Sequence, residues 1–383
     1  MAKSSGTGGP SEETVLEALK AIEDPDLHKD IVTLGFVKEL QIEGDRVSFN
    51  IELTTPACPV KDQFKQKAEE LVGALEGVGE VDVTMTADTS RRAVEQKNLI
   101  PGIKHCVAVA SGKGGVGKST VAANLALALA EEGASVGLLD ADIYGPSQPI
   151  MFGISDRPNV TADRKLIPLE KYGVKLMSIG FIADERMPVI WRGPLVGKMV
   201  QEFLANVQWG DLDYLVVDLP PGTGDAQLTL VQSAPITGAV VVTTPQEVAL
   251  EDVVRALRMF SKVEVPILGL VENMSFFICD GCGKRHDIFS SGGGMRSSEE
   301  LGIPFLGEVP LDGSVVEGGD EGVPIVEADP GSDVAKAFTK LARSVAANVS
   351  VVSMREETSQ SELVQITKDR AGQTDREQAE PTR

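Results

Sequence analysis

A glycine-rich stretch with two lysines carries the chemistry that the sequence shows most clearly. It reads Gly112-Lys113-Gly114-Gly115-Val116-Gly117-Lys118-Ser119-Thr120 and fits the pattern GxxxxGK[ST]. In this pattern successive backbone N–H groups wrap a polyphosphate, and glycine permits the close approach. Lys118 would neutralise the β- and γ-phosphates, and the Ser119 hydroxyl would ligate Mg²⁺. The whole stretch is therefore predicted to bind a nucleotide.

The segments on either side of this loop favour a nucleotide site. An apolar run from Val107 to Ala110 precedes it, and an Ala/Leu-rich segment from Val121 to Ala130 follows it. A strand, a glycine loop and a helix in this order are the context that the pattern requires. The alternative is a loop that merely joins a strand to a helix.

Acidic residues end two further apolar runs. One run ends at Leu138-Leu139-Asp140-Ala141-Asp142, and another, starting at Leu215, ends at Asp218. A carboxylate in the position of Asp218 holds Mg²⁺ through water in P-loop enzymes. Because Asp140 and Asp142 are separated by one residue, their side chains point to opposite sides of a strand end, and we expect them to have different roles. Alternatively, both acids are solvated and cap the next turn.

A cysteine pair, Cys279-Asp280-Gly281-Cys282, places two thiols in one loop. Structural zinc and four-iron clusters normally take four protein ligands. The chain has no second CxxC, and a two-fold dimer would supply four sulfurs. The alternatives are a bridging [4Fe–4S] cluster, a zinc ion with His286 as an extra ligand, and a redox pair, which would usually begin a helix. Ligand chemistry alone does not choose between iron–sulfur and zinc.

Residues 11–90 are predicted to form a small α+β domain after a flexible leader, residues 1–10. Ser11 is a candidate helix N-cap, a hairpin is expected over residues 36–53, and a helix and a strand follow at about 60–75 and 79–85. Cys58 precedes Pro59 at the expected helix start, where the helix N-terminus favours a thiolate. The alternative is a buried small apolar residue.

Residues 103–349 are predicted to form a larger α/β domain, reached through a linker, residues 91–102, and followed by a disordered tail, residues 350–383. Strand signals at 239–243 and 267–271 flank a helix signal at 247–262. Such alternation predicts a doubly wound, mostly parallel sheet with ligands at the carboxyl ends of its strands. Asn273 follows one of these ends, and a turn role is its alternative.

The composition limits the classes of partner. The chain has 383 residues, a net charge of −21 and 4% aromatic residues. Binding to DNA or to an anionic membrane needs positive charge, so neither nucleic acid nor membrane is an expected partner. No signal-like segment or bilayer-spanning apolar run is visible, and four cysteines suit a reducing cytoplasm. The acidity is equally what a high-salt host would favour.

The sequence GKGGVGKST resembles the deviant P-loop ATPases related to MinD and ParA. Further motifs are Asp140 to Ser147, Asp218 to Asp225, Glu272 to Ser275 and Cys279-x-x-Cys282. Together they look like the Mrp/ApbC family of iron–sulfur cluster carriers over about residues 14–348. The segments at 24–26, 32–35 and 54–59 make the first domain similar to the small iron–sulfur assembly domain.

The resemblance implies an ATPase that carries a labile cluster. ATP, Mg²⁺ and a [4Fe–4S] cluster are the implied cofactors, and the implied partners are a second copy of the chain, in a homodimer, and apo iron–sulfur proteins as acceptors. The segment from Pro220 to Asp225 would be a switch loop that senses the γ-phosphate. The implied catalytic residues are Lys113, Lys118, Asp142 and Asp218. Of these, Lys113 would reach a phosphate across the dimer, and Asp142 would position or activate the attacking water. Implied ligands are Ser119, Asp140 and Asp218 for Mg²⁺, Cys279 and Cys282 for the cluster, Asn273 for adenine, and Cys58 as a transfer thiol.

A positioning ATPase like ParA or MinD, or a zinc-binding P-loop scaffold, is the alternative function. A positioning ATPase needs a basic surface for DNA or membrane. The polar tail lacks the basic amphipathic pattern of a membrane-binding helix, and the positioning role leaves the cysteine pair unexplained.

Overall fold

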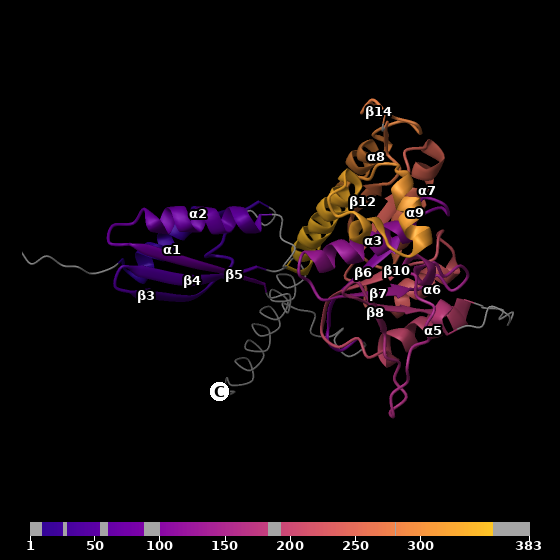
Figure 1. Cartoon of the computed structure of the whole chain (residues 1–383), viewed down its shortest axis with the longest axis horizontal. Helices are drawn as coiled ribbons and strands as arrows, with labels where there is room; N and C mark the ends of the chain where they lie inside the picture. The colour runs from indigo at the N-terminus through magenta and orange to yellow at the C-terminus, as the bar shows by residue number, and fades with distance from the viewer. Residues whose placement is uncertain are drawn as a thin grey trace, which may run out of the picture.

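The computed structural model (Figure 1) describes residues 10–25, 29–53, 60–87, 100–182, 193–279 and 281–354. The predicted leader up to residue 9, the linker up to residue 99, Cys58, Asp280 and residues 355–383 lie outside the described residues.

The first part of the chain forms a three-stranded sheet with two helices. Its helices are α1 (Glu12–Leu19) and α2 (Lys61–Gly73), and its strands β3 (Val37–Glu43), β4 (Arg46–Leu53) and β5 (Glu80–Ala87) lie in the order β3-β4-β5. Strands β3 and β4 are antiparallel, whereas β4 and β5 are parallel. Ser11 caps α1 by accepting from the Thr14 N–H. A short pair not expected from the sequence, β1 (Glu23–Asp24) with β2 (Lys29–Asp30), joins α1 to β3.

Alternation along β4 gives this part its own core. Val47, Phe49, Ile51 and Leu53 are buried while the residues between them are more exposed, as expected for a strand covered on one face. They pack against buried side chains of both helices, Val15, Leu19, Phe64, Ala68 and Val72.

The larger part is built on an eight-stranded sheet in the order β15-β12-β11-β6-β10-β7-β9-β8. All neighbouring strands are parallel except the pair of β8 and β9. The strands are β6 (Ile103–Ala110), β7 (Val136–Asp140), β8 (Leu169–Lys171), β9 (Val174–Ser178), β10 (Leu212–Asp218), β11 (Gly238–Thr243), β12 (Ile267–Glu272) and β15 (Phe305–Glu308). The predicted doubly wound, mostly parallel sheet is confirmed.

Helices cover both faces of this sheet (Figure 1). Along β6, Val107 and Val109 face one core, which includes residues of α3, whereas Cys106 and Ala108 face the other, which includes residues of α5, α6 and α7. The helices are α3 (Lys118–Glu131), α4 (Gln148–Met151), α5 (Gly193–Asn206), α6 (Asp225–Ser233), α7 (Glu247–Lys262), α8 (Gly293–Leu301), α9 (Gly313–Glu321) and α10 (Ile325–Ala328), with a 3-10 turn at Ile179–Phe181 and a last helix at 333–354. Burial on both faces explains why the central strands are continuously apolar.

The last helix corrects one expectation. Residues 350–354, whose surroundings predicted a disordered tail, continue the helix that starts at residue 333. Val345, Ala346 and Val349 are buried, and Val352 packs against the same core. The apolar face of this helix therefore extends past residue 349, into the segment that was expected to be disordered. Among the described residues, no helix combines the length and the apolar character needed to cross a bilayer.

The chain reverses its direction of winding around β6. This strand lies between β10 and β11, so the loop after β6 opens at a switch point of the sheet, where open α/β folds bind ligands. The loops that follow β7, β10 and β12 begin at the same edge of the sheet, because the carboxyl ends of parallel strands lie together.

A buried histidine near the start of β6 predicts a pH-dependent stability. Burial lowers the pKa of His105 to about 4, while Asp213 opposes this shift and Lys104 adds to it. An unfolded histidine titrates near pH 6.5, so unfolding takes up a proton between these values and stability is lost as the pH falls. Between about pH 7 and about pH 5, urea unfolding should show the wild type losing roughly 2 kcal/mol more than His105→Phe. Equal losses in both proteins would contradict this assignment.

Candidate nucleotide site and cysteine hairpin

The predicted phosphate loop connects β6 to α3, and its glycines are required by close contacts. A Cβ on Gly112 would lie 2.3 Å from the carbonyl oxygen of Asp252 in α7. A Cβ on Gly117 would lie 2.2 Å from the amide nitrogen of Asn273, and Gly117 has a φ of +79°. Side chains at these positions would push the loop away from α7 and from the end of β12, so the glycines fix its path.

Below the loop lies a buried group of charges. Lys118 forms an ion pair with Asp218, and both side chains are almost fully buried. The amide nitrogen of Gln148 donates to the other Asp218 oxygen at 2.8 Å and to the backbone oxygen of Ser119 at 3.1 Å. Buried charges are unfavourable unless they are paired and hydrogen-bonded, and this network meets both conditions for Asp218.

Asp140 completes this group from the end of β7. Its carboxylate accepts from the Ser178 hydroxyl at 3.0 Å and from the backbone N–H groups of Ser147 and Gln148 at 3.1 Å each. Burial, and then the nearby charge of Asp218, raise the pKa of Asp140 to about 7. Two carboxylates and one lysine thus share a site that one more cation would balance.

Asp142 faces different surroundings from Asp140. It lines a cavity of about 370 Å³ together with Tyr144, Pro220 and Gln227, between the loops after β7 and β10. Its carboxylate accepts from the Gly145 N–H at 3.2 Å, and burial raises its pKa. The Gly222 N–H donates to the Ser111 oxygen at 3.0 Å, so this cavity adjoins the phosphate loop.

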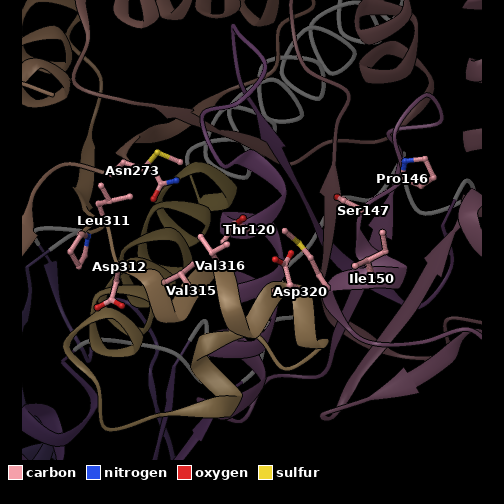
Figure 2. A pocket seen from close by; sticks show the side chains of 14 residues that line it. Thr120, Pro146, Ser147, Ile150, Asn273, Leu311, Asp312, Val315, Val316 and Asp320 are labelled. Carbon is pink, nitrogen blue, oxygen red and sulfur yellow. The ribbon is translucent and has the colours of Figure 1, made fainter. Parts of the chain in front are cut away.

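A larger cavity of about 390 Å³ starts at the first turn of α3 (Figure 2). Figure 2 shows Asn273 and Leu311 on one side of it, Ser147 and Ile150 on the other, and Val315 and Val316 of α9 between them. Apolar walls with a few polar groups at the rim suit a flat organic ring. Asn273 lines the cavity while its amide donates to the Val116 oxygen at 2.9 Å, so it also anchors the phosphate loop.

The cysteines lie in the loop of a short hairpin whose second strand, β14, is drawn near α8 in Figure 1. Strands β13 (Phe277–Ile278) and β14 (Arg285–His286) are antiparallel. The N–H groups of Cys282 and Gly283 donate to the Cys279 oxygen at 3.3 and 2.7 Å, which folds the loop back on itself. Cys282 is exposed and Cys279 is partly exposed, whereas Cys106 is 1% exposed in the sheet core, where burial raises its pKa to about 12.

An arginine holds this hairpin to the domain. The Arg285 guanidinium lies 3.8 Å from the ring centroid of Phe276 and pairs with Asp287 and, at 3.3 Å, with Glu308 of β15. His286, considered as a zinc ligand, is exposed and pairs across the hairpin with Phe277.

The end of β12 connects the nucleotide loop to the cysteine hairpin. Asn273 bonds to the phosphate loop, while the adjacent Glu272 accepts from the Ser275 hydroxyl at 2.6 Å and from the Gly294 N–H at the start of α8. The Ser275 N–H donates to Val309 at 3.0 Å, and the chain then enters the hairpin. One short segment therefore contacts the loop and α8 and then continues into the cysteine hairpin.

The structure brings together most of the predicted site residues. Lys118, Ser119, Asp140 and Asp218 meet beneath the loop, Asp142 faces the adjoining cavity, Lys113 is exposed on the loop, and Cys279 and Cys282 share the hairpin. Gln148 and Gln227 were missed, and Glu272 was identified only as part of a motif, without a role of its own. The burial of Gln148 and Gln227 is what marks them, and the sequence does not show that a polar residue of a helix is buried.

Comparison with known proteins agrees with this geometry. A family model described as NUBPL iron-transfer P-loop NTPase matches residues 102–346, and one described as iron–sulfur cluster assembly protein matches residues 12–83. An iron–sulfur cluster carrier protein of Synechocystis sp. is 48% identical over 89% of this chain and 99% of its own length. The corresponding Deinococcus radiodurans protein is 46% identical over 90% of this chain and 97% of its own.

A solved structure shares the larger fold. It is a nucleotide-binding protein of Archaeoglobus fulgidus in complex with ADP, with 42% identity, a TM-score of 0.53, and coverage of 60% of this chain and 90% of that chain. The family model covers well over half of the residues, and the relatives match nearly end to end. The chain therefore belongs to the NUBPL-type family of iron-transfer P-loop NTPases, within the ParA group, and carries an iron–sulfur cluster assembly domain before its NTPase domain.

Proposed function

We propose that this protein is a homodimeric ATPase that carries a [4Fe–4S] cluster and delivers it to apo iron–sulfur proteins. The observation that carries the proposal is the segment from Glu272 to Cys279, which joins the phosphate loop to the cysteine pair. The relatives are named as cluster carriers, which supports the cargo.

ATP is the proposed substrate of the loop and its neighbouring cavities. The loop N–H groups and Lys118 would hold the phosphates, and the cavity of about 390 Å³ beside Thr120 would take the base. Asn273 would read the adenine ring, and Lys113, exposed on the loop, would reach a phosphate bound to the second copy of the chain.

The buried carboxylates fit Mg²⁺. Asp140, Asp218 and the Ser119 hydroxyl offer hard oxygen ligands. The Ser147 hydroxyl and the Gln148 amide oxygen beside them are buried and have no hydrogen-bond partner among the described residues. Bound Mg²⁺ would neutralise charge on the β- and γ-phosphates. When ATP binds, the Lys118 ammonium would leave Asp218 and pair with the phosphates, because a buried lysine needs a negatively charged partner.

The cluster is proposed to lie between two copies of the chain. Cys279 and Cys282 supply two thiolates, and a second copy related by a two-fold axis would supply the other two of a four-cysteine cluster. Ile278, Ile288 and Met295 around this hairpin are exposed apolar residues, which a partner chain would cover. Cys58, from the assembly domain, is the proposed transfer thiol.

Anaerobic reconstitution with iron and sulfide tests the cargo. The wild type should bind about four irons per dimer with thiolate-to-iron absorbance, and Cys279→Ser/Cys282→Ser should bind essentially none. Cys106→Ala, which changes the buried cysteine of β6, is the matched control and should load like the wild type. Bound zinc in place of iron, or iron retained by the double variant, would contradict the carrier proposal.

ATP turnover tests the nucleotide site. Lys118→Met should lower ATP hydrolysis by about 100-fold or more, because it removes the buried cation that meets the phosphates. Lys171→Met is the control, since the Lys171 ammonium donates to the Phe152 oxygen away from the loop. Hydrolysis that Lys118→Met leaves unchanged would place the activity elsewhere or in a contaminant.

Coupling between the two sites is tested at the end of β12. At ATP concentrations that saturate its nucleotide site, Asn273→Ala should load a cluster normally but lose most of the effect of ATP on its transfer, because the bond to Val116 links loop and hairpin. Asn348→Ala removes a matched bond, from its amide to Leu268 at the opposite end of β12. The rate of cluster transfer to an apo-ferredoxin, with and without ATP, gives the readout. An ATP effect of wild-type size in Asn273→Ala would exclude this route.

A further inference from the structure

The side chain of Gln227 is buried, and its amide makes no hydrogen bond to any described residue. It lies in α6, just after the loop that follows β10, and is 2% exposed. Neither its amide nitrogen nor its amide oxygen has a hydrogen-bond partner in the described structure. Such burial costs about 1–3 kcal/mol for an unsatisfied group, so the position calls for a functional explanation.

The amide lies on a cavity that it shares with a catalytic candidate. Asp142, Gly145, Pro220, Pro221 and Gln227 line this space of about 370 Å³. Pro221 reaches to 4.0 Å from the position that a Cβ of Gly114 would take, so the cavity opens beside the phosphate loop. A small polar molecule in this cavity could reach both the Asp142 carboxylate and the Gln227 amide.

The two side chains offer complementary hydrogen bonds. A carboxylate only accepts, whereas an amide both donates and accepts, so the pair can fix both the position and the orientation of a water molecule. Water-positioning glutamines are known in other P-loop enzymes, where they align the water that attacks the terminal phosphate. The buried, unpaired state of Gln227 is what such a residue would show before nucleotide and water bind.

We propose that Gln227 positions the attacking water in ATP hydrolysis, with Asp142 as the second contact of that water. This inference rests on the ATPase activity proposed above. The water oxygen forms a bond to the γ-phosphorus while the bond from this phosphorus to the β–γ bridging oxygen breaks, and its electron pair leaves with ADP. One water proton stays on the phosphate, and the other passes to Asp142 and then to solvent.

Gln227→Met is the informative variant, because methionine has a similar length and volume but no amide. It should lower kcat by about 10- to 100-fold, since a misoriented water attacks slowly. The Kd for ATP, measured with a fluorescent ATP analogue, should stay within about twofold, because the amide does not hold the nucleotide. The melting temperature without nucleotide should stay equal or rise, because a buried unsatisfied group has been removed.

Gln232→Met is the matched control, since Gln232 is exposed on the same helix. It should behave as the wild type in all three measurements. A wild type no faster than Lys118→Met overturns both this inference and the proposed ATPase. A wild type that hydrolyses ATP at a rate matched by Gln227→Met overturns only the role of Gln227. A lower melting temperature, or a Kd that weakens in step with kcat/KM, overturns it too, because it shows a structural or binding role.

Discussion

Two buried carboxylates and one buried lysine at the carboxyl edge of the sheet are the constraint on which this structure depends. Asp140 and Asp218 end neighbouring parallel strands, so the topology itself forces their charges together. Lys118, Gln148 and backbone N–H groups compensate only part of this charge, and burial, followed by the charge of Asp218, raises the pKa of Asp140. A phosphate loop above a partly compensated acidic site is a place where a nucleotide and a divalent cation satisfy each other's charges.

A second set of contacts links the phosphate loop to the cysteine hairpin. The loop keeps its path because Gly112 lies against α7 and Gly117 lies against Asn273. Asn273 is in turn fixed by its place between the buried Glu272 and the segment that leads to the cysteines. A shift of the loop by a few tenths of an ångström would therefore press on the end of β12, because packed interiors transmit strain. The proposed coupling of nucleotide binding to the cysteine pair would use this route.

The sequence predicts the sheet and the loop because both follow from local patterns. Apolar runs that end in acids, and glycines at fixed spacing, mark strands and turns wherever they occur. Gln148 and Gln227 carry no such pattern, since their importance comes from neighbours about 70 and 85 positions away in the chain. The continuation of the last helix to residue 354 was missed for a related reason, because its stabilising contacts are tertiary. The role of Cys58 stays a prediction.

The most direct test of the shared-cluster proposal is the mass of the reconstituted protein measured under anaerobic, non-denaturing conditions. A shared cluster should give one species of two chains with four irons and four sulfides, which dissociates to bare single chains when the cluster is removed by a chelator. A cluster held by a single chain, or a dimer whose mass shows zinc at the cysteines, would contradict it.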